Sequence, residues 1–374
     1  MTNDTDALKL LNGIADNLLK LQPEAATSLG LDTGPRAALR SQLADRSAEG
    51  ERQIAQRVEA DLARVNALNT DALSHSVRTS IDVVRSAYTT ALEGFALPHG
   101  DVAVGGWRNT PYVVIQNVGA YLDVPRFLES DHPITNGIDA EAYLARMQSY
   151  AKQLDGELER MKAARAAALI PPAFLIDKTL TQMSLSVKNA CEGGSLVKSI
   201  ARRTKNIPGD WAGRARTIAA NQIAPALERQ IDELKAGRAA ATDDPGMWAR
   251  PHGDEFYRWA LKASTTTTMS PDEVHEMGRS ELQRLQAQMD AILKNIGYSQ
   301  RSVGERMKAL AKDPRYKFSE GDRGRAEIMA FINDRLAWIR AQMPRAFGEV
   351  VNPNMEVRRL PPEEEPGAPS AYGG

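Results

Sequence analysis

Cysteine and histidine are scarce in this chain of 374 residues. The single cysteine, Cys191, excludes an internal disulfide, and nothing near it in the sequence supplies the base and positive charge that a cysteine nucleophile needs. No two of the five histidines stand four residues apart, the spacing at which a helix presents two imidazoles to one zinc ion. Cys-x-x-Cys pairs, phosphate-binding glycine loops and glycine-flanked serine nucleophiles are absent as well. The residues alone contain no complete catalytic site.

Neither charge nor hydropathy indicates a nucleic-acid or membrane partner. The chain has 47 basic and 48 acidic residues, so its net charge of −1 gives no electrostatic attraction to either. The longest apolar run, residues 166–176, is too short to span a bilayer and contains Pro171 and Pro172. The first residues, MTNDTDALKLL, lack a basic region followed by an apolar core, so we expect no signal peptide in this sequence. The composition predicts a soluble globular protein.

Apolar residues recur at helical spacing along nearly the whole chain, which predicts an all-α, multi-helix bundle. Residues 48–68 and 71–92 should form an antiparallel helical hairpin. Asp139 is the expected cap of a long core-facing helix, and acidic residues on that helix, such as Glu157 and Glu159, are interpreted as parts of its solvated face. Pro225 is expected to kink a helix over residues 211–235.

The domain organisation expected from these patterns is one helical region over residues 1–360, with a subdivision near 94–123. Residues 361–374 are rich in proline and glycine and should form a linker or a truncated edge. Short strands are expected only near residues 265–268 and 355–360.

The clearest helix start lies at Ser270, where a capping residue is followed by Pro271 and, three positions on, by Glu273. Gly297 should end this helix. Inside it, His275 and the next residue, a glutamate, resemble half of a zinc motif. The second histidine of such a motif is replaced by Arg279, whose charge would repel a metal. We therefore interpret the His-Glu pair as part of the polar face of the helix.

Glycine and aromatic residues concentrate in residues 94–123, the least helical stretch of the sequence. The pair Gly105 and Gly106 permits close approach of the backbone. Two interpretations stay open for this stretch, a loop that lines a substrate cleft and a packed irregular connection. In the first, the candidate substrate-binding residues are Trp107, Arg108, Asn109, Tyr112, Gln116 and Asn117.

Five segments together resemble one known family. They are LLNGIADNLLKLQPEAATSLGLDTG (residues 10–34), NTPYVVIQNVGAYLDVPRFLESDHPI (109–134), DAEAYLARMQSYAKQLDGELERMKAARAAALIPP (139–172), GDEFYRWALKASTTTTMSPDEVHEMG (253–278) and VRRLPPEEEPGAPSAY (357–372). In this order they are similar to bacterial domain-of-unknown-function family 885, whose members are regarded as zinc metallopeptidases. The resemblance implies a large, mostly helical fold like that of other helical zinc peptidases, with a deep substrate cleft.

The resemblance also implies that this chain corresponds to the N-terminal part of the family. Members carry their metal in a His-Glu-x-x-Pro-Gly-His segment and have a later Gly-Glu-Gly-Trp-like helix, and this sequence contains neither. No catalytic residue or metal ligand can therefore be carried over. Zinc is expected only together with the missing C-terminal half, so the chain alone should hold no cofactor and be inactive.

Two function hypotheses follow. In the first, the chain forms the substrate cleft of a zinc-dependent peptidase or hydrolase. In the second, it is a non-catalytic helical module, a degenerate or split member, that binds a peptide or a partner. The expected partners are a peptide substrate, a C-terminal half supplied as a separate chain, or a second copy of this chain. Family members are often exported to the periplasm, whereas this sequence as it stands predicts a cytoplasmic protein.

Overall fold

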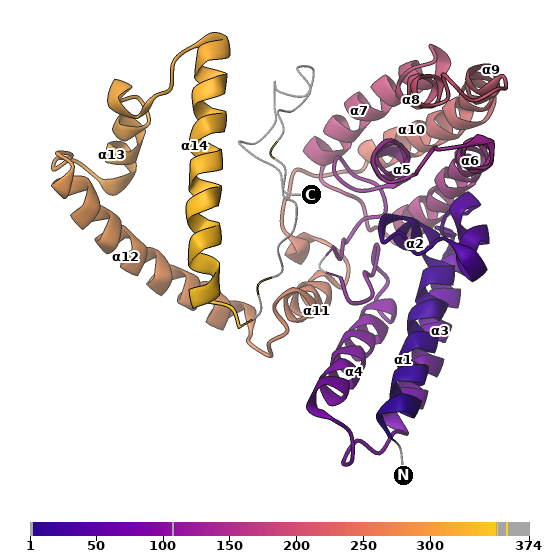
Figure 1. Ribbon diagram of the computed structural model, residues 1–374, viewed down its shortest axis with the longest axis horizontal. Coiled ribbons are helices and arrows are strands. Elements are labelled where there is room, and N and C mark those ends of the chain that lie inside the picture. The colour runs from indigo at the N-terminus through magenta and orange to yellow at the C-terminus, as the bar shows by residue number, and fades with distance from the viewer. Residues whose placement is uncertain (1–2, 107, 349, 351–356, 358–374) are drawn as a thin grey trace. The chain divides into compact units, whose positions relative to one another are not determined.

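The computed structural model describes residues 3–106, 108–348, 350 and 357, and these are almost entirely helical (Figure 1). The all-α prediction is confirmed. The chain divides into two compact units, Met1–Glu273 and Val274–Gly374. The helices of the first unit are α1 (Asp4–Leu21), α2 (Pro23–Ser28), η1 (Gly34–Ser41), α3 (Ala48–Asn66), α4 (His75–Phe95), α5 (Ala120–Ser130), α6 (Gly137–Ala166), α7 (Ala173–Cys191), α8 (Ser195–Arg203), α9 (Trp211–Ile218), η2 (Ala219–Ile223), α10 (Ala224–Arg238), η3 (Met247–Ala249) and α11 (Gly253–Thr265).

Helices α3 and α4 form the predicted hairpin, and α1 lies beside both of them (Figure 1). Helix α3 begins after Ser47, whose side chain accepts a hydrogen bond from the Gly50 N–H. The core between these helices consists of aliphatic side chains at helical spacing that are at most 5% exposed, among them Val58, Val65, Val77 and Ile81. This core fixes the orientation of α3, which carries Glu51 in its first turn.

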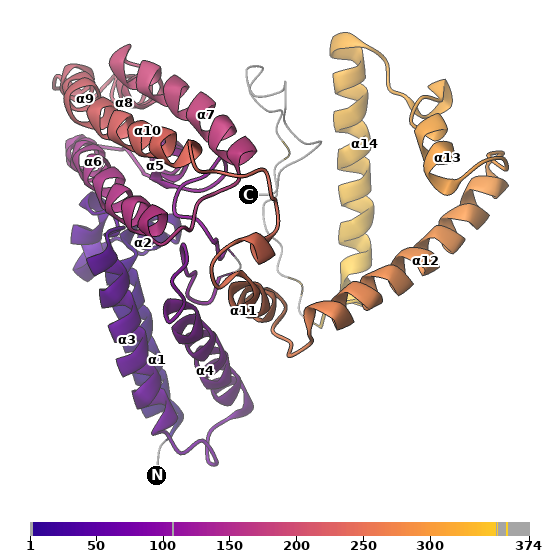
Figure 2. The same ribbon diagram turned by 180° about the vertical axis from the view of Figure 1, so that it is seen from behind.

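Helix α6 runs through the larger core of the first unit and packs against α5, α9 and α10 (Figure 2). Its apolar face is buried as predicted, with Tyr143, Met147, Tyr150 and Leu154 at most 1% exposed. The predicted cap was wrong. Asn136, not Asp139, caps the helix, because its side chain accepts from the N–H groups of Ile138 and Asp139. The Asp139 carboxylate instead accepts from the backbone and hydroxyl of Thr135.

The helix predicted over residues 211–235 has an irregular turn next to Pro225, and the kink itself stays a prediction. Helices α9 and α10 are joined by a π-helical turn, Ala219–Ile223, and Pro225 lies in the first turn of α10. The wider turn accommodates the missing N–H and the ring of Pro225 without breaking the helix. It also faces the core, since Ala219 and Ile223 are 1% exposed.

The connection between α4 and α5 is non-helical over its described residues, 96–106 and 108–119, close to the predicted range. Two isolated bridges, Asp101 with Thr110 and Ile115 with Val118, fold it back on itself. Gly100 permits this, because a Cβ there would lie 1.9 Å from the Thr110 carbonyl oxygen. The fold of the connection places Asp101 beside α6.

The strand predicted at residues 265–268 is wrong. Thr265 ends α11, and Thr266 follows in the left-handed region with φ 57°. The Thr265 hydroxyl donates to the Leu261 carbonyl at 2.8 Å, so local hydrogen bonding of threonine side chains competes with strand pairing. Of the strand predicted at 355–360 only residue 357 is described, and the predicted linker at 361–374 lies outside the described residues.

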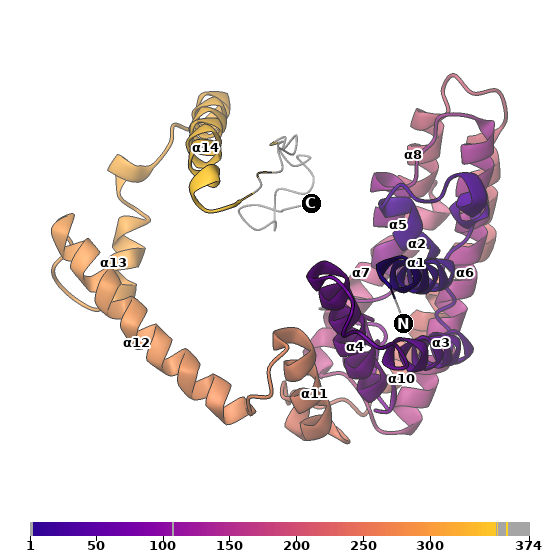
Figure 3. The same cartoon turned by 60° about the horizontal axis from the view of Figure 1, so that its bottom comes forward.

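Helix α12 (Pro271–Asn295) leads into the second unit, which also contains α13 (Val303–Leu310), η4 (Pro314–Tyr316), α14 (Gly321–Gln342) and η5 (Met343–Arg345) (Figure 3). The predicted start is confirmed, because the Glu273 N–H donates to the Ser270 hydroxyl while the Glu273 carboxylate accepts from the Ser270 N–H. The predicted end is confirmed by Gly297, whose φ is +96°. No helix among the described residues is long and apolar enough to cross a bilayer.

The two long helices of the second unit carry large apolar side chains that stay exposed. His275 is exposed too, and Glu276 lies 3.8 Å from Arg279, as expected for a polar helix face. The apolar residues of α12 and α14 that are between 39% and 60% exposed are Met277, Leu282, Leu285, Ile292, Ile328, Phe331, Trp338 and Ile339.

A buried arginine, Arg146 on α6, joins η1, α2 and α5 in the first unit. It is 0% exposed and forms no ion pair among the described residues. Its guanidinium donates to four neutral acceptors, namely the Thr27 hydroxyl (2.6 Å), the Leu39 carbonyl (3.1 Å), the Gln42 carbonyl (2.9 Å) and Nδ1 of His132 (2.7 Å). Nε2 of His132 lies 3.0 Å from the Asp139 carbonyl, so the imidazole is neutral with its proton on Nε2.

His132 is expected to resist protonation. Burial, with Arg146 and Arg203 nearby, lowers its pKa to about 4 from an ordinary value of 6.5. A depressed pKa means that the contribution of His132 to stability is complete above pH 6.5. It should fall by about 3 kcal/mol as the pH drops from 6.5 to 4. An NMR titration of the imidazole checks this, and a His132 midpoint near 6.5 would contradict it.

Candidate active-site cleft

A cleft of about 720 Å³ lies in the first unit, between α2, α3, α5 and the connection 96–119. Its wall combines charged with apolar side chains. The charged residues are Glu24, Asp45, Arg46, Glu51, Asp101, Arg108, Asp123, Arg126, Asp131 and Arg160, and the apolar ones include Ile54, Phe95, Val102, Val118, Val124 and Phe127. A cleft of this size and mixed character is typical of a ligand site.

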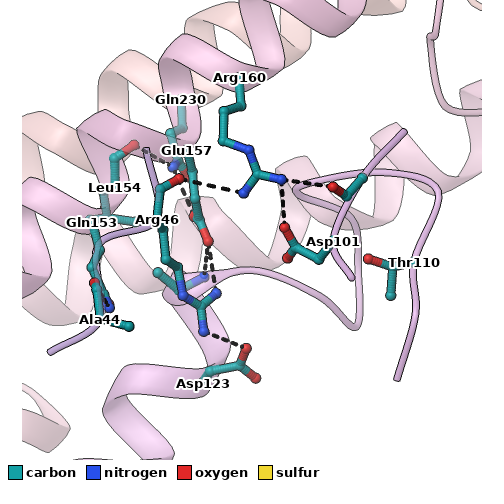
Figure 4. Close-up of polar contacts among 12 residues, drawn as sticks. Ala44, Arg46, Asp101, Thr110, Asp123, Gln153, Leu154, Glu157, Arg160 and Gln230 are labelled. Carbon is teal, nitrogen blue, oxygen red and sulfur yellow. Dashed lines mark hydrogen bonds and ion pairs between the residues drawn. The ribbon is translucent and has the colours of Figure 1, made fainter. Parts of the chain in front are cut away.

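A fully buried carboxylate, that of Glu157, lies behind the cleft wall and pairs with Arg46, which lines the cleft. Glu157 of α6 is 0% exposed, and its Oε1 accepts from Nη1 of Arg46 and from the Ala120 N–H, both at 2.8 Å. Its Oε2 accepts from the Gln230 side chain at 3.2 Å (Figure 4). Burial raises the pKa of Glu157 and Arg46 opposes that shift. All three neighbours donate, so they stabilise the carboxylate form.

Arg46 bridges the buried Glu157 and the cleft residue Asp123. Its Nη2 lies 3.2 Å from the Asp123 carboxylate on α5 (Figure 4). Asp123 also lies 3.1 Å from Nη1 of Arg108, which is 41% exposed and donates a second hydrogen bond to the Asn117 carbonyl. Alternating charges therefore run from the buried α6 to the surface of the connection 96–119.

A second group is centred on Arg160, one turn further along α6. Its Nη2 lies 2.6 Å from Glu51 and 2.7 Å from Asp101. Arg160 is 8% exposed, whereas both carboxylates are 31% exposed and face the cleft. Burial, opposed by Arg160 and helped by Asp101, raises the pKa of Glu51 to about 7. Glu51 is thus poised to exchange a proton near neutral pH.

The structure separates the six predicted substrate-binding residues. Arg108 lines the cleft, and the Asn109 side chain accepts from the Ala103 N–H and so holds the connection together. Tyr112 is buried, accepts from Arg250 at 3.0 Å and lines a different, smaller cavity. Gln116 is half-buried, Asn117 is exposed, and Trp107 lies outside the described residues.

Sequence reasoning missed most of the charged cleft residues. Glu157 was wrongly interpreted as solvated, because its neighbour Glu159 belongs to the exposed face. A usable signal existed, since Glu157 stands three residues after Leu154 and seven after Tyr150, within the apolar stripe of α6. A lone charge inside such a stripe indicates a buried, paired side chain.

The described residues offer no fit for a zinc ion. No three side chains of the metal-binding types His, Cys, Asp and Glu come together among them in an arrangement that could hold one. His132 is committed to Arg146 and the Asp139 carbonyl. Of the cleft carboxylates, Glu51, Asp101 and Asp123 pair with arginines.

Comparison with known proteins gives a family and a fold. No curated protein sequence matches the chain. A solved structure that it is similar to is described as the "putative lipoprotein" from Colwellia psychrerythraea, with a TM-score of 0.90 and 22% identity, which shows a shared fold. The match covers 99% of this chain and 64% of that one, so this chain spans less than two thirds of that protein's length. The family model "Bacterial protein of unknown function (DUF885)" matches residues 23–373, and the chain belongs to this family.

Proposed function

We propose that this chain supplies the peptide-binding cleft of a zinc-dependent hydrolase. The observation that supports the proposal most is the cleft of about 720 Å³ with its alternating charged and apolar wall. A peptide presents backbone amides and side chains of both characters, so such a wall offers it hydrogen bonds, ion pairs and apolar contacts together. The resemblance to zinc metallopeptidases points to hydrolysis in the complete enzyme.

In this proposal the chain is the N-terminal part of the enzyme and contributes binding without the metal. Arg108 and Asp123 would orient the ligand, because both line the cleft and reach its surface. Glu157 would hold Arg46 in place from below. The zinc ligands would come from the C-terminal part of the enzyme, supplied in the same polypeptide or as a separate chain.

A second candidate is a non-catalytic helical module that binds a partner. The exposed apolar side chains of α12 and α14 favour it, because eight large hydrophobic residues between 39% and 60% exposed are costly to leave in water. A helical polypeptide with its own apolar face is the partner chemistry that would cover them.

Narrowing the cleft should weaken peptide binding. Ser130 is exposed at the end of α5 and lines the cleft, so the change Ser130→Trp adds an indole there without disturbing the ion pairs. We expect a panel of pentapeptides to bind the unaltered chain, and the variant to bind at least about tenfold more weakly, about 1.4 kcal/mol. Isothermal titration calorimetry measures both affinities.

The matched control is Ser80→Trp, which places the same side chain at an exposed serine of α4 away from the cleft lining. It should leave the affinity unchanged. Equal affinity of all three proteins would show that peptides bind elsewhere. Peptide hydrolysis by the chain alone, dependent on added zinc, would contradict the division of roles.

A further inference from the structure

We propose that the first unit contains a second ligand site, a pocket that binds a single-ring aromatic carboxylate. The pocket has a volume of about 170 Å³ and lies between α5, α6, α7, α8 and α10. It shares no lining residue with the cleft, because the two use opposite sides of α5. Tyr121, Leu122 and Pro125 line the pocket, whereas Asp123 and Phe127 line the cleft. The ligand of the pocket is therefore separate from the peptide of the proposed function.

The size and the wall of the pocket fit one aromatic ring. The wall is mostly apolar, with Ile223 and Leu227 among its residues, and no described residue with a charged side chain lines it. An apolar protein cavity of about 150 Å³ holds a benzene molecule, so this pocket has room for a ring with a small substituent. The rings of Tyr121 and Tyr150 belong to the wall, and aromatic side chains favour stacked or edge contacts with another ring.

A buried hydroxyl without a partner opens into the pocket. Tyr150 is 1% exposed, and its hydroxyl forms no hydrogen bond with any described residue. The described side-chain atoms that are unpartnered and fully enclosed belong to other residues, so this hydroxyl is reachable from the pocket that Tyr150 lines. The Tyr121 hydroxyl, by contrast, donates to the Ile115 carbonyl at 3.0 Å. A buried hydroxyl normally has a partner, because its burial without one costs free energy. The partner that Tyr150 lacks is an oxygen of the ligand.

The start of α8 supplies further donors to the same pocket. Ser195, Leu196 and Val197 form the first turn of this helix and line the pocket. Their backbone N–H groups have no acceptor among the described residues, and the cap residue, Gly194, provides no side-chain acceptor. Free N–H groups at the start of a helix bind anions, because they donate hydrogen bonds at the positive end of the helix dipole. A carboxylate is the anion that a single ring can carry into so small a pocket.

The pocket is open to such a ligand from the outside. Asn189 and Ser195 both line it and are exposed, so its mouth lies at the corner between α7 and α8. A carboxylate at this mouth accepts from the α8 N–H groups, and its ring extends inward against the apolar wall. In a pocket of this volume the same ligand also reaches Tyr150. A ring without the carboxylate would leave these donors unpaired, and a carboxylate without the ring would leave the apolar part empty.

The test is calorimetric titration of the full chain at pH 7 with three probes. Sodium benzoate has both parts of the ligand, sodium acetate has only the carboxylate, and benzyl alcohol has the ring without the charge. We expect benzoate to bind with a Kd below about 1 mM, and each of the other probes to bind at least about tenfold more weakly. Absence of benzoate binding up to about 10 mM would overturn the proposal. So would equal affinity for benzoate and acetate, because the pocket would then contribute nothing.

Two variants connect the affinity to the pocket. Tyr150→Phe removes only the unpartnered hydroxyl and should weaken benzoate binding about tenfold, whereas Tyr88→Phe, in the core between α3 and α4, should leave it unchanged. Ala190→Leu fills part of the pocket and should weaken binding at least about tenfold, with Ala163→Leu on the exposed face of α6 as its control. Circular dichroism checks that each variant is folded. If Ala190→Leu does not fold, Tyr150→Phe decides alone. Unchanged benzoate affinity in the folded pocket variants would overturn the proposal, because benzoate would then bind elsewhere.

Discussion

Replacing Arg146 by methionine is expected to lower the free energy of unfolding of the first unit by about 4 kcal/mol or more. Methionine keeps most of the apolar stem of the side chain. It loses the guanidinium, whose carbon lies 4.7 Å from the centre of the Phe127 ring. The change removes the donor for four acceptors on three other segments, and three of these bonds, to Thr27, Leu39 and His132, are buried. Those three acceptors belong to residues that are at most 7% exposed, so each loses a hydrogen bond that water does not readily replace.

The measurement is urea denaturation followed by hydrogen exchange of the α6 amides, which reports the first unit separately from the second. The control, Lys152→Met, removes an exposed positive charge from the same helix and should change stability by less than about 0.5 kcal/mol. Equal stability of the two variants would mean that the buried acceptors find other donors.

The change Glu157→Gln is expected to cost about 3–5 kcal/mol in the free energy of unfolding. The size of the side chain stays the same, but the charge that faces Arg46 is lost and an NH₂ group replaces one oxygen. The groups that donate to Glu157 are the Arg46 guanidinium, the Ala120 N–H and the side-chain NH₂ of Gln230. The new NH₂ faces the NH₂ of Gln230, and Arg46 loses its buried partner and keeps only Asp123.

Thermal or urea denaturation of the variant measures this effect, with Glu159→Gln on the exposed face of α6 as the matched control. A double variant with Arg46→Met should recover part of the loss, because removing both partners leaves no unpaired charge. A double variant whose loss of stability equals the sum of the losses of the two single variants would show that the two residues contribute independently of their ion pair.

The helices followed from the sequence because their apolar residues recur at helical spacing. The hairpin of α3 and α4, the buried face of α6 and the capped start at Ser270 were all predicted in this way. Two details failed for local reasons. Asn136 and Asp139 are both capping types, and only the backbone geometry decides between them. The threonines at 265–268 have high strand propensity, yet their hydroxyls bond to the nearby backbone.

The candidate site was harder to predict than the helices. Arg46 precedes α3, Asp101 lies in the connection 96–119, and Asp123 belongs to α5. These residues are so far apart in the sequence that no single stretch contains all three. Only the folded chain brings them against α6. The glycine-rich stretch 94–123 was predicted as a candidate cleft-lining loop. Arg108, one of the residues named in that prediction, lines the cleft.

The π-helical turn at Ala219–Ile223 connects the length of one helix to the environment of Glu157. A π turn holds one residue more than the corresponding stretch of regular α-helix, so a regular helix here would be one residue shorter. Losing that residue would restore regular α geometry but rotate α10 by about 100° relative to α9. Gln230 would then leave its position beside Glu157. A one-residue deletion in this segment would therefore remove a donor from the buried carboxylate that holds Arg46.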